Sequence, residues 1–181
     1  MTQIYLPDSE PGPEMSVRAP SPRSLAGTRI AVLDNGKPNA GVVMERVAET
    51  VAARVGATVS LVTKKGPEGR SANAAIPMAR DIFERLQAEA DVDITGAADC
   101  GSCTAYSVKD TIELEDAGIP AVVVTTTKFE PVASTLSANF GLADTRRLVL
   151  PHPIGGTDQP TLHDWADAAA DRVIELLTSA P

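Results

Sequence analysis

Two cysteines three positions apart, Cys100 and Cys103, have the residue type and spacing best suited to chemistry in this sequence. Free N–H groups and the helix dipole at a helix start stabilise a thiolate, lowering a cysteine pKa from about 8.5 toward about 3.5 to 7.5. Such a thiolate is nucleophilic at neutral pH, and a second cysteine one turn on can attack a disulfide formed at the first. The motif therefore favours a thiol-dependent enzyme in which Cys100 attacks and Cys103 resolves. Two buried cysteines acting as small hydrophobic residues are the alternative.

Hydroxyl and imidazole groups accompany this motif. Ser102 and Thr104 place hydroxyls beside the sulfurs, where they could bind a substrate. His152 stands between two prolines after a predicted strand, and it could act as a general base, a proton donor or a metal ligand. A histidine that only fastens its own loop is the alternative. We expect Cys100, Cys103 and His152 to form the catalytic centre.

A dense polar cluster directly follows the first predicted strand and consists of Asp34, Asn35, Lys37 and Asn39. Asp34 could orient a base or bind a substrate hydroxyl, while Lys37 could hold an anion. Because Asn35 precedes a glycine, the segment is equally typical of a turn, and a purely structural loop is the alternative.

Four of the five lysines follow predicted strands, namely Lys37, Lys64, Lys65 and Lys128. Cations gathered on one edge of an otherwise acidic protein favour a small anionic substrate, such as a carboxylate or a phosphate. Thr127 and Lys128, after the fourth strand, join the residues expected to bind it. Ordinary solvated loop lysines are the alternative.

The elements that must position these residues alternate regularly along the chain. Short Val, Ile and Leu runs predict strands at residues 29–33, 58–62, 92–95, 121–125 and 147–150, and an amphipathic helical segment follows each. Strict alternation favours a parallel sheet with helices on both faces. The predicted fold is a three-layer, doubly wound, five-stranded α/β sheet of flavodoxin-like type. In such sheets ligands bind beyond the carboxyl ends of the strands, where the residues above are found.

Apolar spacing also predicts the buried face of each helix. The predicted stripes are Val43, Val47, Val51 and Val55; Ile76, Ala79, Phe83 and Leu86; Val108 and Ile112; Val132, Leu136 and Phe140; and Leu162, Trp165, Ala169, Val173 and Leu176. In the last helix, Thr161 with Asp164 resembles a capping pair, and His163 is predicted to lie on the surface.

The first 27 residues differ from the rest, because five prolines stand among Ser, Glu and Gly without an apolar period. We interpret residues 1–27 as an extended N-terminal arm, either a loose tail or a segment packed across a partner subunit. Residues 28–181 are predicted to form a single α/β catalytic domain.

Composition narrows the partners and the compartment. A formal net charge of −8 disfavours nucleic acid and anionic membrane surfaces as partners of the whole surface. The sequence shows neither a signal peptide nor a spanning segment, so we expect a cytoplasmic location. In a reducing compartment, two closely spaced cysteines indicate redox, catalytic or metal chemistry more than a structural disulfide.

At Asp99-Cys100-Gly101-Ser102-Cys103-Thr104 the sequence resembles the UGSC family, named for a selenocysteine-Gly-Ser-Cys motif, with cysteine in place of selenocysteine. The segment Leu33-Asp34-Asn35-Gly36-Lys37-Pro38-Asn39 is similar to the opening motif of that family, and the resemblance covers about residues 29–178. It implies that Cys100 is the primary nucleophile or redox atom. The family name describes a motif and implies no substrate.

Three hypotheses about function stay open. The first is thiol chemistry, either redox or addition to an electrophilic small molecule, with no cofactor. The second is a site for zinc or another divalent metal made by Cys100, Cys103 and His152, which would suit a hydratase, lyase or hydrolase. The third is a subunit of a hetero-oligomeric enzyme that completes the site of a companion chain. We also expect the protein to form a homo- or hetero-oligomer. Flavin binding is suggested by analogy of fold alone.

Overall fold

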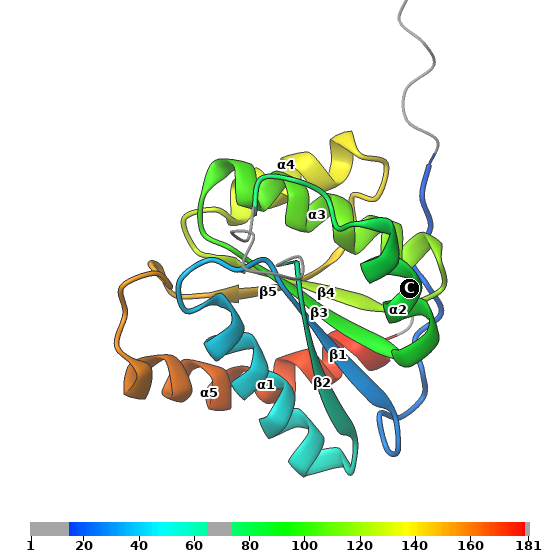
Figure 1. Ribbon diagram of the computed structural model, residues 1–181, viewed down its shortest axis with the longest axis horizontal. Helices are drawn as coiled ribbons and strands as arrows, with labels where there is room; N and C mark the ends of the chain where they lie inside the picture. Colours follow the sequence, from blue (N-terminus) through cyan, green and yellow to red (C-terminus); the bar gives the residue numbers. More distant parts are fainter. Residues whose placement is uncertain (1–14, 65–73, 180–181) are drawn as a thin grey trace, which may run out of the picture.

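The structure is a computed structural model that describes residues 15–64 and 74–179. Its centre is a sheet of five parallel strands in the order β2-β1-β3-β4-β5 (Figure 1). The strands are β1 (Arg29–Asp34), β2 (Thr58–Thr63), β3 (Val92–Ala98), β4 (Ala121–Thr126) and β5 (Arg146–Leu150). The order reverses between β1 and β3, and this is the point where ligands bind in open sheets of this kind.

Helices cover both faces of the sheet. They are α1 (Ala40–Val55), α2 (Arg80–Glu89), α3 (Gly101–Asp116), α4 (Glu130–Asn139) and α5 (Gln159–Thr178). Helices α1 and α5 pack together on one face, whereas α2, α3 and α4 lie on the other (Figure 1). The predicted three-layer, doubly wound, flavodoxin-like fold is confirmed.

Valine spacing explains the packing of α1. Val43, Val47 and Val51 recur every fourth residue, so they share one face of the helix, and all three are completely buried against the sheet and α5. Gly56 then ends the helix with φ of 74°, a left-handed conformation that glycine adopts without strain. The predicted stripe and its stop are therefore confirmed, with Val55 only partly buried.

Two other helices differ from their predicted faces. In α4 the fully buried residues are Ala133 and Ser137, while Val132 is 39% exposed. Small side chains let this helix lie close to α3, so the buried face is turned by one residue from the apolar one. Helix α2 begins only at Arg80, which leaves Ile76 outside the helix and 47% exposed. The predicted stripes were wrong at these positions.

The start of α5 is also earlier than predicted. Asp158 is the N-cap, and its carboxylate accepts the N–H of Thr161 at 3.1 Å. Thr161 therefore lies inside the first turn, and the predicted capping pair of Thr161 with Asp164 was wrong. Asp158 is the residue that satisfies the free N–H groups at this end.

The described part of the predicted arm, residues 15–27, contains neither helix nor strand and packs against its own domain. Ala19 and Leu25 are buried, and the N–H of Ser16 donates to the Gly141 carbonyl at 3.1 Å. Part of this segment is thus packed on its own domain, while Met15 and Val17 are exposed. Residues 1–14 of the arm lie outside the described residues.

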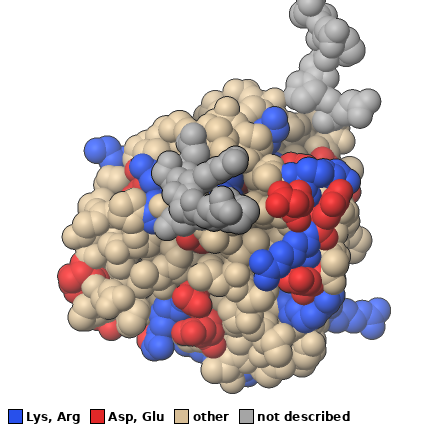
Figure 2. Space-filling model, in the orientation of Figure 1, with Lys and Arg blue, Asp and Glu red and all other residues tan. Residues whose placement is uncertain are grey.

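Basic and acidic side chains lie next to each other over the face shown in Figure 2. On α2, for example, Arg80 pairs with Glu84 and Arg85 with Glu89, each one turn apart. Such pairing neutralises positive charge locally instead of gathering it. In the described part of the chain, no helix is both long enough and apolar enough to cross a membrane.

Candidate functional site

The two cysteines lie at the junction of β3 and α3. Cys100 is the N-cap residue of α3, and Cys103 is the third residue of the helix. The N–H of Cys103 donates to the Cys100 sulfur at 3.4 Å, and the N–H of Cys100 donates to the Cys103 sulfur at 3.0 Å. The two sulfurs thus perform the reciprocal capping usually made by a hydroxyl and a carboxylate. The structure pairs them as a disulfide, with Cα atoms 5.5 Å apart.

The two sulfur-bearing residues differ in exposure. Cys103 is completely buried, whereas Cys100 is half-buried. Ser102 is exposed, and its hydroxyl lies 3.9 Å from the Cys100 sulfur. Thr104 is buried, and its hydroxyl donates to the Cys100 carbonyl at 2.5 Å. Ser102 is therefore accessible to solvent beside the Cys100 sulfur, while Thr104 stabilises the first turn of α3.

The backbone of β3 is irregular just before the motif. The register with β4 shifts between Thr95 and Ala98, and Gly96 has φ of 145°. A Cβ atom at Gly96 would lie 2.8 Å from the Val124 carbonyl oxygen, so a larger residue does not fit without displacing β4. Only glycine suits this position, which sets the direction of the strand as it approaches the cysteines.

His152 lies in the loop between β5 and α5, residues 151–158, here called the histidine loop. Its Nδ1 atom is 3.1 Å from the hydroxyl of Thr126 at the end of β4. Its ring packs at a tilt against Phe129, with centroids 5.7 Å apart. The neighbouring hydroxyl of Thr125 donates to the Ala98 carbonyl at 3.2 Å, which joins the end of β4 to the end of β3.

Most side chains of the polar cluster after β1 form hydrogen bonds that stabilise loops. Asp34 accepts the N–H of Gly36 at 2.8 Å, which closes a tight turn. Asn35 is buried, and its side-chain amide donates to the Ala97 carbonyl at 2.9 Å. Asn39 donates from its side-chain amide to carbonyls of the histidine loop. Through these contacts, Asn35 and Asn39 fix the loops at the carboxyl edge of the sheet relative to one another.

The lysines divide into two groups. Lys37 is half-buried and Lys128 is exposed, both in loops at the carboxyl edge of the sheet, as is the exposed Thr127. Lys64 is instead buried, and its ammonium lies 2.6 Å from the carboxylate of Asp110. Its prediction as a substrate-facing cation was wrong, because a carboxylate of α3 already neutralises it. Lys65 lies outside the described residues.

Two buried carboxyl groups lie between the sheet and α3. Burial raises the pKa of Asp93 to about 7. The hydrogen bond from Thr95 lowers this pKa, and the nearby Asp110 carboxylate raises it further. Burial also raises the pKa of Asp110, opposed mainly by the Lys64 ammonium. One oxygen of Asp93 has no hydrogen-bond partner among the described residues. Asp93 is therefore neutral over much of the acidic range.

Sequence reasoning missed three residues that organise the site. Asp99 accepts the N–H of Gly155 at 3.1 Å, and Thr126 and Phe129 hold the His152 ring. Each stands at the carboxyl end of a strand or in the loop after it, which is the one signal in the sequence that could have indicated them. Their partners are distant along the chain.

The predicted metal ligands are not gathered as a set. In residues 15–64 and 74–179, no three His, Cys, Asp or Glu side chains are grouped so that they could hold a metal ion. The sulfurs of Cys100 and Cys103 face each other, and the Nδ1 atom of His152 faces the hydroxyl of Thr126. The arrangement therefore offers no support for the three-ligand alternative.

Comparison with solved structures returns distant relatives of the fold. An NAD(P)H:quinone oxidoreductase from Methanothermobacter marburgensis is 14% identical, with a TM-score of 0.49 over 82% of this chain and 100% of that chain. The lactose-specific IIB component domain of the phosphotransferase system from Streptococcus pneumoniae is 8% identical, with a TM-score of 0.32 over 82% of this chain and 96% of the other. Neither similarity informs the chemistry of this chain.

No curated protein matches the sequence significantly. The UGSC family model matches residues 3–179, which includes most of the predicted arm and nearly all of the predicted α/β domain. The match is thus longer than the two motifs suggested. With the two cysteines of the motif at the start of α3 and a family match over nearly the full length, the chain belongs to the UGSC family.

Proposed function

We propose that the protein is a thiol-dependent oxidoreductase that acts on a small anionic, electrophilic organic molecule. The observation that carries this proposal is the pair of cysteines at the start of α3, one half-buried and one fully buried, with their sulfurs within bonding reach of each other. Cys100, the more accessible of the two, suits the attacking role. The buried sulfur of Cys103 suits the resolving role, because only an adduct on Cys100 is close to it.

An organic disulfide illustrates how electrons and protons balance. The Cys100 thiolate attacks one substrate sulfur, the substrate S–S bond breaks, and the first thiol leaves with a proton. The Cys103 thiolate then attacks the Cys100 sulfur and releases the second thiol, again with a proton. The substrate gains two electrons, and the protein loses them as it forms the Cys100–Cys103 disulfide. A cellular dithiol or low-molecular-weight thiol must then reduce the protein again.

Other residues of the site have supporting roles in this proposal. His152, held by Thr126 through Nδ1, would deliver protons to the leaving thiols. Lys37 and Lys128 would attract the anionic group of the substrate. Ser102 would donate to a substrate atom beside the Cys100 sulfur, with which its hydroxyl is nearly in contact. Asp34 and Thr127 border the same edge.

Alkylation with iodoacetamide tests the attacking role. After reduction, Cys100 should react at neutral pH about tenfold or more faster than free cysteine, because the start of a helix stabilises its thiolate. Peptide mass spectrometry separates modification at Cys100 from modification at Cys103, which should react slowly because it is buried. A Cys100 rate no higher than that of free cysteine would contradict the proposal.

A trapping experiment tests the resolving role. Cys103→Ser should accumulate a mixed disulfide between Cys100 and an anionic aromatic disulfide, since no second thiol can release it. The wild type should instead release both halves of the reagent as thiols, in equal amounts. The double variant Cys100→Ser/Cys103→Ser is the matched control and should form no adduct. Equal adduct levels in wild type and Cys103→Ser would remove Cys103 from the mechanism.

A further inference from the structure

Asn39 fastens the histidine loop to the loop after β1. Its side-chain amide donates to the Ile154 carbonyl at 2.9 Å and to the Thr157 carbonyl at 2.8 Å. Both N–H bonds of the amide are therefore used within the protein. The backbone of Asn39 has φ of 66°, in the left-handed region that asparagine tolerates better than other residues with a side chain. Asparagine thus supplies both the backbone conformation and the two donors.

Asp99 fastens the same loop to the end of β3. Its carboxylate accepts the N–H of Gly155 at 3.1 Å. A Cβ atom built on Gly155 would lie 3.5 Å from the Asp99 carboxylate and 4.0 Å from the Pro38 carbonyl, so three loops meet at this glycine. Asp99 directly precedes Cys100 in the chain.

From these contacts we propose that Asn39 and Asp99 are positioning residues that fix the histidine loop, and with it His152, relative to Cys100. The inference rests on the proposed function, because the position of His152 relative to Cys100 matters only if His152 transfers protons in the reaction of Cys100. The hydroxyl of Thr126 holds the imidazole itself. Asn39 and Asp99 hold the backbone that follows it, from two other loops.

Strand spacing supports the geometry. Strands β3 and β5 are separated only by β4, so their carboxyl ends lie about 10 Å apart. Cys100 and His152 each lie two residues beyond the end of their strand. The Asp99–Gly155 hydrogen bond spans the remaining gap between the two loops. It joins the histidine loop directly to the segment that bears Cys100.

The first test compares Asp99→Ala with Asp99→Asn by amide hydrogen exchange. Alanine removes the acceptor, so the Gly155 amide should exchange about fivefold to tenfold faster. Asparagine keeps a carbonyl oxygen that can accept the same N–H, and it should restore exchange to within about twofold of wild type. Rescue by asparagine separates the hydrogen bond from the charge of Asp99.

The second test uses the two histidines of the chain as a probe and a reference. The imidazole NMR signals of His152 should shift in Asp99→Ala and in Asn39→Gly, while those of His163 on α5 should stay in place. Glycine keeps the left-handed backbone at position 39 and removes only the side-chain donors. Asn39→Gly therefore also tests the proposal if Asp99→Ala does not fold.

The third readout is the pH profile of Cys100 alkylation, which a change in stability alone would not move. It should shift in Asp99→Ala and Asn39→Gly. Unchanged Gly155 exchange, His152 signals and alkylation profiles in these variants would overturn the inference. Slow alkylation of wild-type Cys100 together with faster Gly155 exchange in Asp99→Ala would overturn the proposed function and still support the loop contacts, so the two failures are distinguishable.

Discussion

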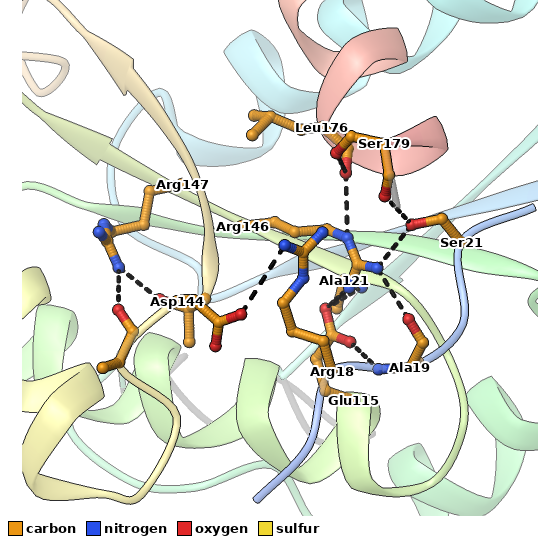
Figure 3. Close-up of polar contacts among 12 residues, drawn as sticks. Arg18, Ala19, Ser21, Glu115, Ala121, Asp144, Arg146, Arg147, Leu176 and Ser179 are labelled. Carbon is orange, nitrogen blue, oxygen red and sulfur yellow. Dashed lines mark hydrogen bonds and ion pairs between the residues drawn. The ribbon is translucent and has the colours of Figure 1, made fainter. Parts of the chain in front are cut away.

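The two ends of helix α3 differ in solvent accessibility and in the groups that they hold. At its amino end the helix presents the half-buried Cys100 and satisfies its first N–H groups with sulfur. At its carboxyl end, Glu115 forms an ion pair with Arg146 in which both side chains are completely buried (Figure 3). The amino end is partly accessible to solvent, whereas the carboxyl end encloses two charges. Under the proposed function, the same helix serves chemistry at one end and stability at the other.

Both members of this buried ion pair form further hydrogen bonds, as Figure 3 shows. Glu115 accepts the N–H of Ala19 at 2.6 Å and the N–H of Ala121 at 3.0 Å. Arg146 donates to the Ala19 carbonyl at 2.8 Å and to the Leu176 carbonyl at 3.0 Å. Buried charges are tolerated only when such partners replace water. The N-terminal arm therefore completes this end of the fold, which gives a physical reason for its inclusion in the family match.

The largest predicted effect follows from breaking this pair. Glu115→Ala leaves the Arg146 guanidinium buried without its carboxylate and the Ala19 N–H without an acceptor. We expect a loss of about 3 to 5 kcal/mol in the free energy of unfolding. Urea denaturation measures it. Glu84→Ala on the exposed face of α2 is the matched control and should change stability by less than about 0.5 kcal/mol. Similar losses in both variants would contradict the contrast.

Asp93 gives the next largest effect, through pH. Its pKa is about 7 in the folded chain against an ordinary 3.8, so between these values the unfolded chain ionises while the folded chain stays protonated. Unfolding is favoured as pH rises through this window, by about 1 kcal/mol per pH unit, and the slope ends above the folded pKa. Asp93→Asn should remove this slope from a plot of unfolding free energy against pH. A slope unchanged in the variant would assign it to other groups.

The sequence predicted those parts of the molecule that depend on local periodicity. The alternation of strands and helices gave the fold, and the fourfold valine spacing gave the buried face of α1. The motif at Cys100 was placed correctly at a strand-to-helix junction for the same reason. The buried face of helix α4 was not predicted by this periodicity. Its buried residues, Ala133 and Ser137, are small enough for close packing, whereas the apolar pattern is defined by large side chains.

Contacts between residues distant in the chain could not be predicted in this way. Lys64, which follows strand β2, is neutralised by Asp110, which lies 46 positions further on in helix α3. Asn39 binds a carbonyl 115 positions away, so its role in holding the histidine loop had no local signal. Side-chain type shows what a residue can do, and the fold decides which partner it meets.

A smaller effect is expected at the arm. Ser21 accepts a hydrogen bond from Arg146 at 2.8 Å and donates one to the Ser179 carbonyl at 2.5 Å. Ser21→Ala removes both, but it leaves the ion pair with Glu115 in place. We expect a loss of about 1 kcal/mol, measured by urea denaturation. Ser24→Ala, at an exposed position of the same arm, is the control: it removes only an exposed hydrogen bond from the Ala26 N–H and should cost less than about 0.5 kcal/mol. A loss near that of Glu115→Ala would mean that the arm contributes more than hydrogen bonds.

The smallest change in stability is predicted at the other end of α3, where we expect a complete loss of the proposed thiol chemistry. Serine is a favoured N-cap residue, so in Cys100→Ser the hydroxyl replaces sulfur as the acceptor for the Cys103 N–H. Measured on reduced protein, the free energy of unfolding should change by less than about 0.5 kcal/mol. Rapid alkylation should disappear, because an alcohol does not ionise at neutral pH. A large loss of stability would instead mean that the Cys100 sulfur is a structural element, like the ion pair at the opposite end.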